Sequence, residues 1–382
     1  MTTTMDIKMV DTVGQYRRIQ AEMDAAIHEV LETGAYIKGP AVKRFADNFA
    51  AYLGAKHVVP CANGTDALQI ALMALDLKPG DEVITTPFTF FATAEVIALL
   101  GLVPVFVDIE EHTFNIDPSK LEAAITSKTR CIIPVHLFGL VSDMEPILEI
   151  AQRHGLHVVE DNAQAIGSIY TFRDGRKAQA GLMGDIGSTS FYPSKNLGAY
   201  GDAGALYTND AGLADAMQVI CNHGGHKKYY HERIGLNSRL DSIQAAVLDV
   251  KLRHLDAYTA ARQQAAAWYD ELLGNVSGIS IPGRPAYSTH VFHQYTLRIE
   301  GGRAHRDQLQ VMLADRKIPT MIYYPVPLHV QQAAAPYGYK AGDFPVTERC
   351  CEQVISLPMH TELDRAQVEY ITQQVIACYH SL

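Results

Sequence analysis

Apolar and polar positions follow two alternating patterns between residues 57 and 160. Short apolar runs, typical of strands, alternate with amphipathic segments that have helical spacing. Strands that alternate with helices favour a mostly parallel sheet covered by helices on both faces. The sequence therefore predicts an α/β fold, with a further strand over 203–208. The predicted strands are 57–61, 82–86, 103–107, 131–135 and 156–160, and the predicted helices are 67–75, 93–100, 118–125 and 143–154.

The pattern changes after residue 241. A long predicted helix over 242–273 has buried-type residues at helical spacing and resembles a connector between two domains. Beyond it, we predict strands over 279–281, 293–299 and 319–324, and helices over 305–316 and 365–379. This mixture is typical of a small α+β domain. We predict a large domain over 1–255, whose N-terminal arm holds helices 14–32 and 41–53, and a small domain over 256–382.

Composition limits the possible classes of function. The 382 residues are 48% hydrophobic and carry a formal net charge of −10, which argues against nucleic-acid or membrane-surface partners. No apolar run approaches the roughly 20 residues that span a bilayer, and the N-terminus lacks the apolar region of a signal peptide. We therefore expect a soluble, cytoplasmic protein without a membrane partner.

The cysteines and histidines give no sign of a metal site. The six cysteines lack CxxC spacing and lie mostly in apolar runs, which predicts reduced, buried thiols. Three histidines between 223 and 231 lack the carboxylates or regular spacing of metal ligands. We interpret their glycine-rich stretch as a loop at the edge of a ligand site.

Several polar segments follow directly after predicted strands. In a parallel sheet, ligands bind at the carboxyl ends of the strands. The segments at those ends are the loop after 60, Phe88-Thr89-Phe90, His136, and Asp161-Asn162-Ala163-Gln164. The sequence thus predicts a single ligand cleft at this edge.

The first of these segments contains a turn with Gly64 and Thr65 between a strand and a helix. Free backbone N–H groups and the positive end of a helix dipole suit a phosphate. The alternative is that Thr65 or Asp66 only caps the helix.

Lys195 follows a strand-like stretch of small and aromatic residues and has no neighbouring charge. A lysine that loses hydration in such surroundings has a lowered pKa. Its neutral amine could form an imine with an aldehyde such as pyridoxal phosphate. The alternative is a lysine in a surface loop, and this stretch alone leaves both open.

Asp161 ends a buried run and needs a cationic partner, which a pyridinium nitrogen would supply. The alternative is a cap on the next turn. Phe90 offers a similar choice, between filling the core and stacking on a flat cofactor.

Five segments together resemble the DegT/StrS-type sugar aminotransferases over nearly the whole chain. They occur in the order and spacing of that family and are Gly64-Thr65-Asp66-Ala67-Leu68, Phe88-Thr89-Phe90, Asp161-Asn162-Ala163-Gln164, Ser190-Phe191-Tyr192-Pro193-Ser194-Lys195 and Asn237-Ser238-Arg239-Leu240-Asp241. The resemblance implies a fold-type I enzyme that depends on pyridoxal 5′-phosphate and works as a homodimer with shared active sites.

The resemblance also implies roles for individual residues. Lys195 would be the Schiff-base lysine and proton carrier, and Asp161 would pair with the pyridine nitrogen. Gln164 would lie near the phenolic oxygen and Phe90 would stack on the ring. The phosphate would be held by Gly64, Thr65, Ser190 and, from the neighbouring subunit, Asn237.

The substrates follow from the same resemblance. The amino donor would be L-glutamate and the acceptor a 3-keto nucleotide sugar, with UDP-2-acetamido-3-keto-hexuronic acid as the leading hypothesis, for cell-surface polysaccharide or glycoconjugate synthesis. The residues expected to contact the sugar substrate are Tyr192, Arg239, Tyr323, Tyr324 and His329. Some relatives carry histidines in place of the two consecutive tyrosines, which leaves the sugar open.

Other functions remain as alternatives. The acceptor could be a dTDP-3-keto-6-deoxyhexose, or the chain could be a non-catalytic regulator, which would not need both Lys195 and Asp161. A Rossmann oxidoreductase is disfavoured because no G-x-G-x-x-G follows the first strand.

Overall fold

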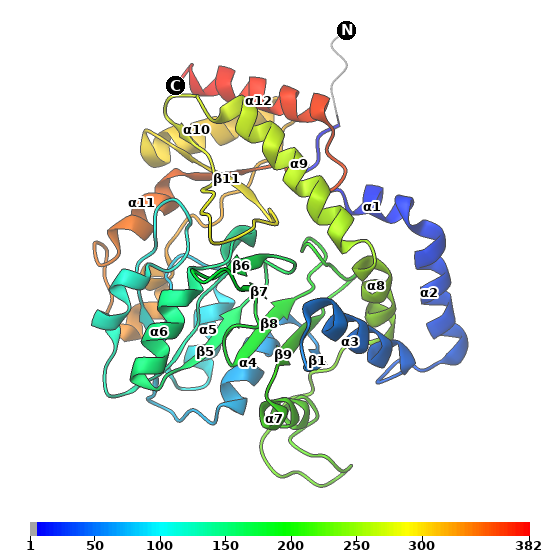
Figure 1. The fold of residues 1–382 in the computed structure, drawn as a ribbon. Helices are drawn as coiled ribbons and strands as arrows, with labels where there is room; N and C mark the ends of the chain where they lie inside the picture. Colours follow the sequence, from blue (N-terminus) through cyan, green and yellow to red (C-terminus); the bar gives the residue numbers. More distant parts are fainter. Residues whose placement is uncertain (1–5) are drawn as a thin grey trace.

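The computed structural model describes residues 6–382 and is organised around a seven-stranded sheet (Figure 1). Its strand order is β1-β9-β8-β5-β4-β2-β3. Strand β9 runs antiparallel to β1 and β8, and the other pairs are parallel. The predicted mostly parallel sheet is thus confirmed. The strands are β1 (His57–Cys61), β2 (Glu82–Thr85), β3 (Val103–Phe106), β4 (Thr129–Ile132), β5 (His157–Asp161), β8 (Ile186–Ser190) and β9 (Gly204–Thr208).

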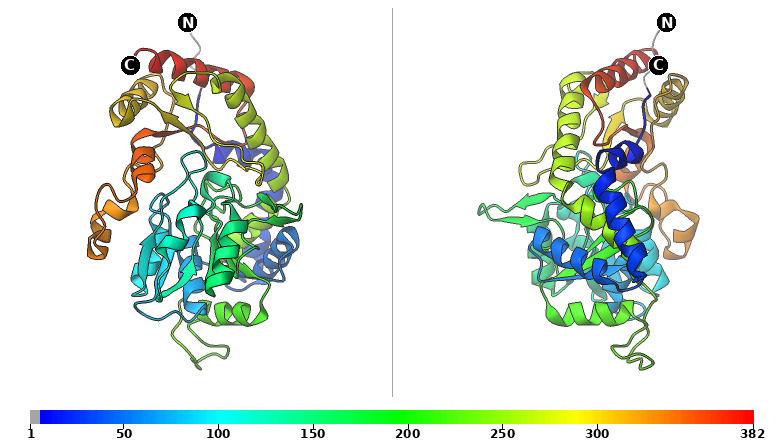
Figure 2. Two further views of the ribbon diagram at one scale, coloured as in Figure 1. Left: turned by 60° about the vertical axis from the view of Figure 1, so that its left-hand side comes forward. Right: turned by 90° about the vertical axis from the view of Figure 1, so that its right-hand side faces the viewer.

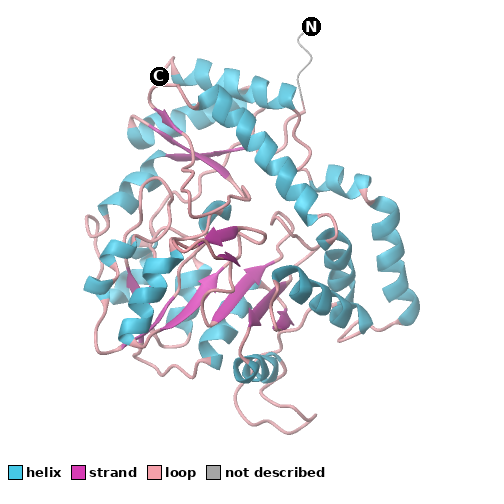
Figure 3. Cartoon of the chain, viewed as in Figure 1, coloured by secondary structure: helices cyan, strands magenta, loops and turns pink. Residues whose placement is uncertain are grey.

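Helices cover both faces of this sheet (Figure 3). Neighbouring residues on a strand point to opposite faces, so Val158 and Val159 of β5 enter different apolar clusters. One face packs against α4 (Gly64–Ala74), α5 (Ala92–Leu99) and α7 (Ala211–Cys221). The other face packs against α3 (Pro40–Leu53), α6 (Met144–His154) and α8 (Ser242–Leu252).

A second sheet of three antiparallel strands lies beyond the carboxyl ends of the large sheet (Figure 1). Its strands are β10 (Ile279–Ser280), β11 (Tyr295–Ile299) and β12 (Val354–Leu357). A separate apolar cluster joins this sheet to α9 (Leu255–Leu273), α10 (Gly302–Asp315) and α12 (Arg365–Tyr379). The α+β character of the C-terminal part agrees with the prediction, while the division between residues 255 and 256 stays a prediction.

The N-terminal arm consists of α1 (Thr12–Arg18) and α2 (Gln20–Thr33), which pack along α8. The predicted break before the next helix is present, because Gly34 has a left-handed φ of 64° and Pro40 begins α3.

The segment from η4 (Leu328–Val330) through η5 (Gln332–Tyr337) to α11 (Pro345–Gln353) runs along the β3 edge (Figure 2). There the ring of Tyr339 contacts that of Phe106. This C-terminal segment therefore packs against the large sheet.

The predicted helix over 242–273 is two helices, α8 and α9, separated at Arg253 and His254. No glycine or proline marks this break. The break arises because α8 packs on the large sheet and α9 on the small one. Leu252, at the end of α8, and Leu255, at the start of α9, still pack in the same apolar cluster. The predicted helix over 118–125 is likewise wrong, since the structure has two short 3-10 turns, η1 (Pro118–Lys120) and η2 (Glu122–Ala124).

The predicted strand over 319–324 is also wrong. Met321 forms a single bridge with Ser356, and the following residues leave the small sheet. The structure instead contains three elements that the sequence pattern did not predict, the hairpin of β6 (Ile169–Thr171) and β7 (Lys177–Gln179), helix α11, and strand β12. A further 3-10 turn, η3 (Leu137–Gly139), follows β4.

All six cysteines are buried and unpaired, which confirms their predicted state. None of the helices formed by residues 6–382 has the length and apolarity needed to cross a bilayer.

Candidate active site

A cleft of about 750 Å³ opens at the carboxyl ends of β1, β5 and β8. Its far wall is formed by His293 and Gln294, which precede β11, and by a loop with two consecutive tyrosines. The cleft brings together most of the predicted site residues, namely Gly64, Thr65, Phe90, Asp161, Gln164, Ser190, Tyr192, Lys195, Tyr323 and Tyr324.

Lys195 lies in a tight turn directly after β8, where its backbone N–H donates to the carbonyl of Tyr192 at 2.8 Å. The side chain reaches the cleft and is half-buried by the surrounding protein. Burial lowers the pKa of its amine to about 8, although the charge of Asp161 acts in the opposite direction. The direction agrees with the prediction, and the neutral amine, although the minor form near physiological pH, is far more abundant than for an ordinary lysine.

Asp161 ends β5 and is 5% exposed. Its Oδ2 accepts a hydrogen bond from the Thr93 hydroxyl at 2.9 Å, and its Oδ1 accepts one from the backbone N–H of Ala163 at 3.2 Å. Burial raises the pKa of this carboxyl above its ordinary value, while both hydrogen bonds and the charge of Lys195 oppose the rise. A buried carboxylate so arranged favours a cationic ligand.

The sequence pattern did not mark Thr93 as a site residue. It stands on α5 four residues after Thr89, and their hydroxyl oxygens are 3.4 Å apart. A threonine in the first turn of the helix that follows the predicted ligand segment Phe88-Thr89-Phe90 was the available signal.

The turn before α4 forms a cradle at the amino end of that helix. Asn63 caps the helix, since its Oδ1 accepts from the backbone N–H of Asp66 at 2.8 Å. The cap is therefore Asn63 and not Thr65 or Asp66. The backbone N–H groups that the cap leaves free lie at the amino end of the helix, next to the cleft. A Cβ on Gly64 would lie 2.5 Å from the Cβ of Ser190, so only glycine allows this close approach.

Gln164 connects the two walls of the cleft. Its Oε1 accepts from the backbone N–H of Phe138 at 2.8 Å, which fixes the orientation of the amide. Its Nε2 donates to the hydroxyl of Tyr324 at 3.4 Å. Phe90 is 60% exposed at the mouth of the cleft, which is unusual for a large apolar side chain and leaves a ring face free to stack.

Some predicted residues lie elsewhere. His329 does not line the cleft, because its ring is 1% exposed, packs on Phe344 and contacts Glu348 Oε1 at 3.0 Å through Nε2. The expectation that it contacts substrate is wrong for the cleft of its own chain. The segment from Leu328 turns away from the cleft towards β3, which carries this histidine with it.

His136 is also excluded from the cleft. Its ring is fully buried behind β5, where Nε2 contacts Glu160 Oε2 at 2.8 Å. Asn237 and Arg239 lie outside the cleft of their own chain, and Arg239 lines a separate hollow with Lys38 and Lys43. The role predicted for Asn237 at a neighbouring subunit stays a prediction.

The histidine-rich loop has no metal-binding cluster. His226 bridges the carboxylates of Asp215 and Glu232 at the surface. Over residues 6–382, no three His, Cys, Asp or Glu side chains are placed to hold an ion.

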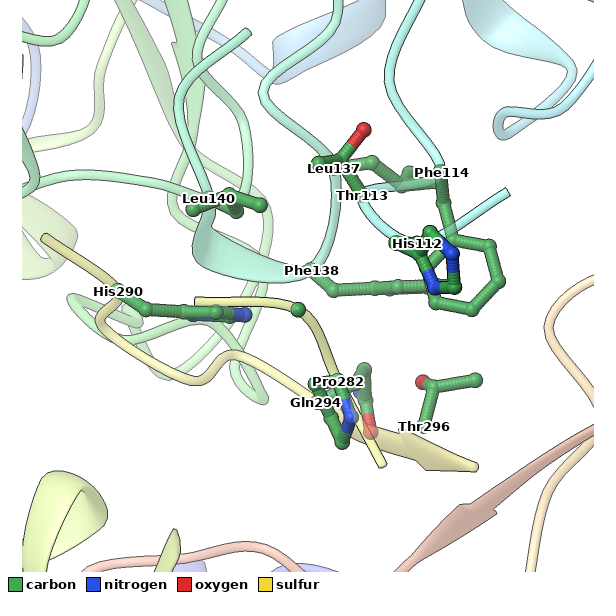
Figure 4. Close-up of a pocket in the computed structure, with 11 residues that line it drawn as sticks. His112, Thr113, Phe114, Leu137, Phe138, Leu140, Pro282, His290, Gln294 and Thr296 are labelled. Carbon is green, nitrogen blue, oxygen red and sulfur yellow. The ribbon is translucent and has the colours of Figure 1, made fainter. Parts of the chain in front are cut away.

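A much smaller enclosed cavity lies behind the cleft wall (Figure 4). It shares Phe138 and Gln294 with the cleft, and His290 and His112 lie on opposite sides of it. Its volume of about 10 Å³ is comparable to a single water molecule, so it is no site for a cofactor.

Comparison with known proteins identifies the family. The sequence profile of the DegT/DnrJ/EryC1/StrS aminotransferase family matches residues 17–376. The chain belongs to this family. The predicted resemblance is thereby confirmed over nearly the whole chain.

Similar proteins carry both enzymatic and regulatory names. A "Pleiotropic regulatory protein" of Geobacillus stearothermophilus is 48% identical over 98% of this chain and 99% of that protein. A "UDP-2-acetamido-2-deoxy-3-oxo-D-glucuronate aminotransferase" of Pseudomonas aeruginosa is 45% identical over 96% of this chain and 98% of that protein. A "dTDP-3-amino-3,4,6-trideoxy-alpha-D-glucose transaminase" of Streptomyces venezuelae is 42% identical over 95% and 94%, respectively.

Solved structures of the family share the fold. DesV of S. venezuelae, in complex with a ketimine intermediate, has a TM-score of 0.93 at 40% identity and covers 99% of both chains. NtdA from Bacillus subtilis, with bound cofactor PMP, has a TM-score of 0.87 at 32% identity and covers 97% of this chain and 83% of that one. The fold-type I class is confirmed. The family depends on pyridoxal phosphate, as predicted.

Pyridoxal phosphate fits the residues of this cleft. The buried carboxylate of Asp161 suits a pyridinium nitrogen, and the exposed face of Phe90 suits the ring. The cradle at Gly64 offers backbone N–H groups to a phosphate, and Lys195 offers a partly neutral amine. These are the groups that the cofactor requires, gathered in one cleft.

Proposed function

We propose that this protein transfers an amino group from L-glutamate to C3 of a 3-keto nucleotide sugar. The favoured acceptor is a UDP-linked 2-acetamido-3-keto-hexuronic acid, and the aminated sugar would feed synthesis of a cell-surface polysaccharide or related glycoconjugate. The observation that carries the chemistry is the lysine with a lowered pKa that shares one cleft with the buried Asp161. The 45% identity to a 3-oxo-glucuronate aminotransferase supports the acceptor.

In this proposal, Asp161, Phe90 and the Gly64 turn hold the cofactor, which supplies an electron sink when bound. Lys195 is the tether and the proton carrier. Its Nζ takes the proton from the α-carbon of L-glutamate; the amino group would stay on the cofactor, and water would supply the oxygen of the 2-keto acid that leaves. After the amino group reaches the sugar, the same Nζ returns a proton to C3.

The acceptor would enter past Tyr192, Tyr323 and Tyr324, which line the outer part of the cleft. Tyr192 is 56% exposed and is free to meet a sugar or a nucleotide. Burial raises the pKa of Tyr324, so its hydroxyl keeps its proton and can donate to a ligand oxygen.

We further propose that the enzyme is a homodimer whose active sites are shared. The loop near Asn237 exposes large apolar side chains, with Tyr229 79% and Ile234 85% exposed, as expected of a surface covered by a partner. Arg239 makes no salt bridge within residues 6–382 and would meet an anionic group of the substrate in the partner's cleft.

Two alternatives have specific support. A dTDP-linked 3-keto sugar as the acceptor has support from the identity of 42% to a dTDP-sugar transaminase. A regulator is suggested by the name of the 48% identical relative, but binding alone would not require Lys195 with its lowered pKa.

The experiment is a single turnover of the protein loaded with pyridoxal phosphate. Addition of L-glutamate should change the visible absorption within one turnover, and a later addition of the correct 3-keto sugar nucleotide should restore it. Lys195→Ala should slow the glutamate step at least about 100-fold. A panel of UDP- and dTDP-linked 3-keto sugars, with 4-keto sugars as the control, distinguishes the acceptors. Absence of any glutamate-dependent change would favour the regulator.

A further inference from the structure

Lys251 of α8 is buried, and no carboxylate among residues 6–382 forms a salt bridge with it. It is 1% exposed, and its Nζ donates to the backbone carbonyl of Gly198 at 2.6 Å. The ring of Tyr200 lies 5.4 Å from the amine. Burial, assisted by the charge of Arg262, lowers the pKa of Lys251 to about 7. Because lysines are rarely buried completely, a specific role for this amine is expected.

The backbone carbonyl that accepts the hydrogen bond from Lys251 belongs to the loop that carries Lys195. Gly198 lies three residues after Lys195, in a turn closed by a bond of 2.7 Å from the N–H of Ala199 to the carbonyl of Phe191. A second residue of α8, Gln244, accepts from the backbone N–H of Tyr200 at 2.8 Å. Helix α8 therefore holds the loop at two points.

The same loop is tied to the opposite wall of the cleft. Asn196 donates through Nδ2 to the carbonyl of Val291 at 2.8 Å. Arg262 of α9 donates through Nη1 to the carbonyls of Phe292 at 3.0 Å and Met359 at 3.1 Å. His293, which follows, lines the cleft. Two buried cations on either side of the break between α8 and α9 thus hold both walls through backbone carbonyls.

We propose that Lys251 is a positioning residue for Lys195. By holding the Gly198 carbonyl, it keeps the turn after β8 closed and limits where the Lys195 amine can reach. The inference rests on the proposed function, because it concerns the residue that carries the proton there. Both amino-transfer steps use Lys195, so loosening this turn slows both of them and leaves substrate affinity nearly unchanged.

The variant Lys251→Met tests this, because methionine preserves the apolar stem and removes the donor. The matched control is Arg306→Met. Arg306 is also a buried cation, 2% exposed, and it donates to the carbonyl of Cys351 at 3.0 Å, but it pairs with Asp307 and makes no hydrogen bond to the Lys195 loop. Both variants lose a buried donor to a backbone carbonyl, and only one of the two donors holds the Lys195 loop.

For each variant, two measurements are made in addition to the melting temperature. The first is hydrogen–deuterium exchange of peptides that cover 195–201, with and without pyridoxal phosphate. The second is the single-turnover rate with L-glutamate. We expect Lys251→Met to speed the exchange and to lower the rate about 10- to 100-fold, with little change in the KM for glutamate. Lys251→Arg should recover part of the rate, and Arg306→Met should change stability but neither readout.

An unchanged rate and exchange in Lys251→Met would overturn the inference, and so would an equal loss in Arg306→Met. If Lys251→Met does not fold, Gln244→Leu removes the other anchor from α8 and should act in the same direction, and its failure to do so would also overturn the inference. If the wild-type protein does not react with L-glutamate, the proposed function is wrong, and the exchange measurement still decides the role of Lys251.

Discussion

Thr93 donates its hydroxyl proton to Oδ2 of Asp161 across 68 residues of sequence, at 2.9 Å. This contact joins α5 to the end of β5 and gives the buried carboxylate a fixed orientation. Because the hydrogen bond favours the ionised carboxylate, it offsets part of the effect of burial.

We expect Thr93→Val to weaken the binding of pyridoxal phosphate about 10- to 100-fold, since a hydrogen bond to a charged group contributes about 1.5–3 kcal/mol. The loss should grow as the pH falls, because the pKa of Asp161 rises further without the donor. Absorbance titration with the cofactor measures the affinity. Thr89→Val is the control, since Thr89 contacts Thr93 and not Asp161. Unchanged affinity in Thr93→Val would contradict the role of this bond.

Gly64→Ala should impair binding of the phosphate group in particular. The added Cβ would lie 2.5 Å from the Cβ of Ser190 and would push apart the two sides of the cradle. Affinity for pyridoxal phosphate should fall about tenfold or more, whereas affinity for pyridoxal, which lacks the phosphate, should change little. Gly212→Ala on α7 is the control, because only a flexible side chain lies near its Cβ. Equal losses for both ligands would place the phosphate elsewhere.

The reaction of the cofactor-free protein with pyridoxal phosphate should speed up with increasing pH and level off above about 8. The neutral amine is the nucleophile, and burial lowers the pKa of Lys195 to about 8. Stopped-flow absorbance over pH 6 to pH 10 measures the profile. A rate that still rises at pH 10, as expected for the ordinary lysine pKa of about 10.4, would show that the amine is hydrated.

The same pKa shift has a consequence for stability. Between about pH 8 and about pH 10.4, the folded chain binds fewer protons at Lys195 than the unfolded chain. The unfavourable contribution of Lys195 to the stability of the fold therefore becomes smaller as the pH rises through that window. Lys195→Met should therefore raise the melting temperature of the cofactor-free protein at pH 7, and the gain should shrink towards pH 10. A gain independent of pH would point to packing instead.

Glu160→Gln should destabilise the fold itself. The buried carboxylate accepts from His136 at 2.8 Å and from the backbone N–H groups of Gly181, Met183 and Gly184 at 2.7, 2.6 and 2.6 Å. The glutamine amide would place its own N–H groups next to these donors, which should lower the free energy of unfolding by about 3–5 kcal/mol. The free energy of unfolding in urea measures the loss.

Glu271→Gln is the control for that measurement. Its pair with Arg365 is exposed and screened by solvent, so its loss should change the free energy of unfolding little. A similar loss of unfolding free energy in the two variants would mean that the buried hydrogen bonds of Glu160 stabilise the fold no more than an exposed ion pair does.

Much of the site could be predicted from the sequence because its residues belong to local patterns. The Gly64 turn, Asp161 and Lys195 each follow an apolar strand, and the carboxyl ends of neighbouring strands lie on one edge of the sheet. The residues that support them could not be predicted in this way. Thr93, Asn63 and Lys251 look like ordinary helix or turn residues until the distances between elements are known.

The wrong predictions have the same origin. The apolar run over 319–324 fits a strand by composition, but its neighbours in space leave it a single bridge at Met321. The pattern over 242–273 fits one helix, and the need to cover two sheets divides it. His329 follows two tyrosines that reach the cleft, yet the chain turns before it and buries it beside Glu348.

The sequence by itself determined the alternation of strands and helices, the mostly parallel sheet and the chemistry gathered at its edge, because these depend on periodicity and on turns between adjacent residues. Only the tertiary structure decided how hydrated Lys195 is, which groups hold Asp161 in place, and which candidates enter the cleft. Those properties depend on burial and on contacts between elements distant in the chain, and a linear pattern does not contain these distances.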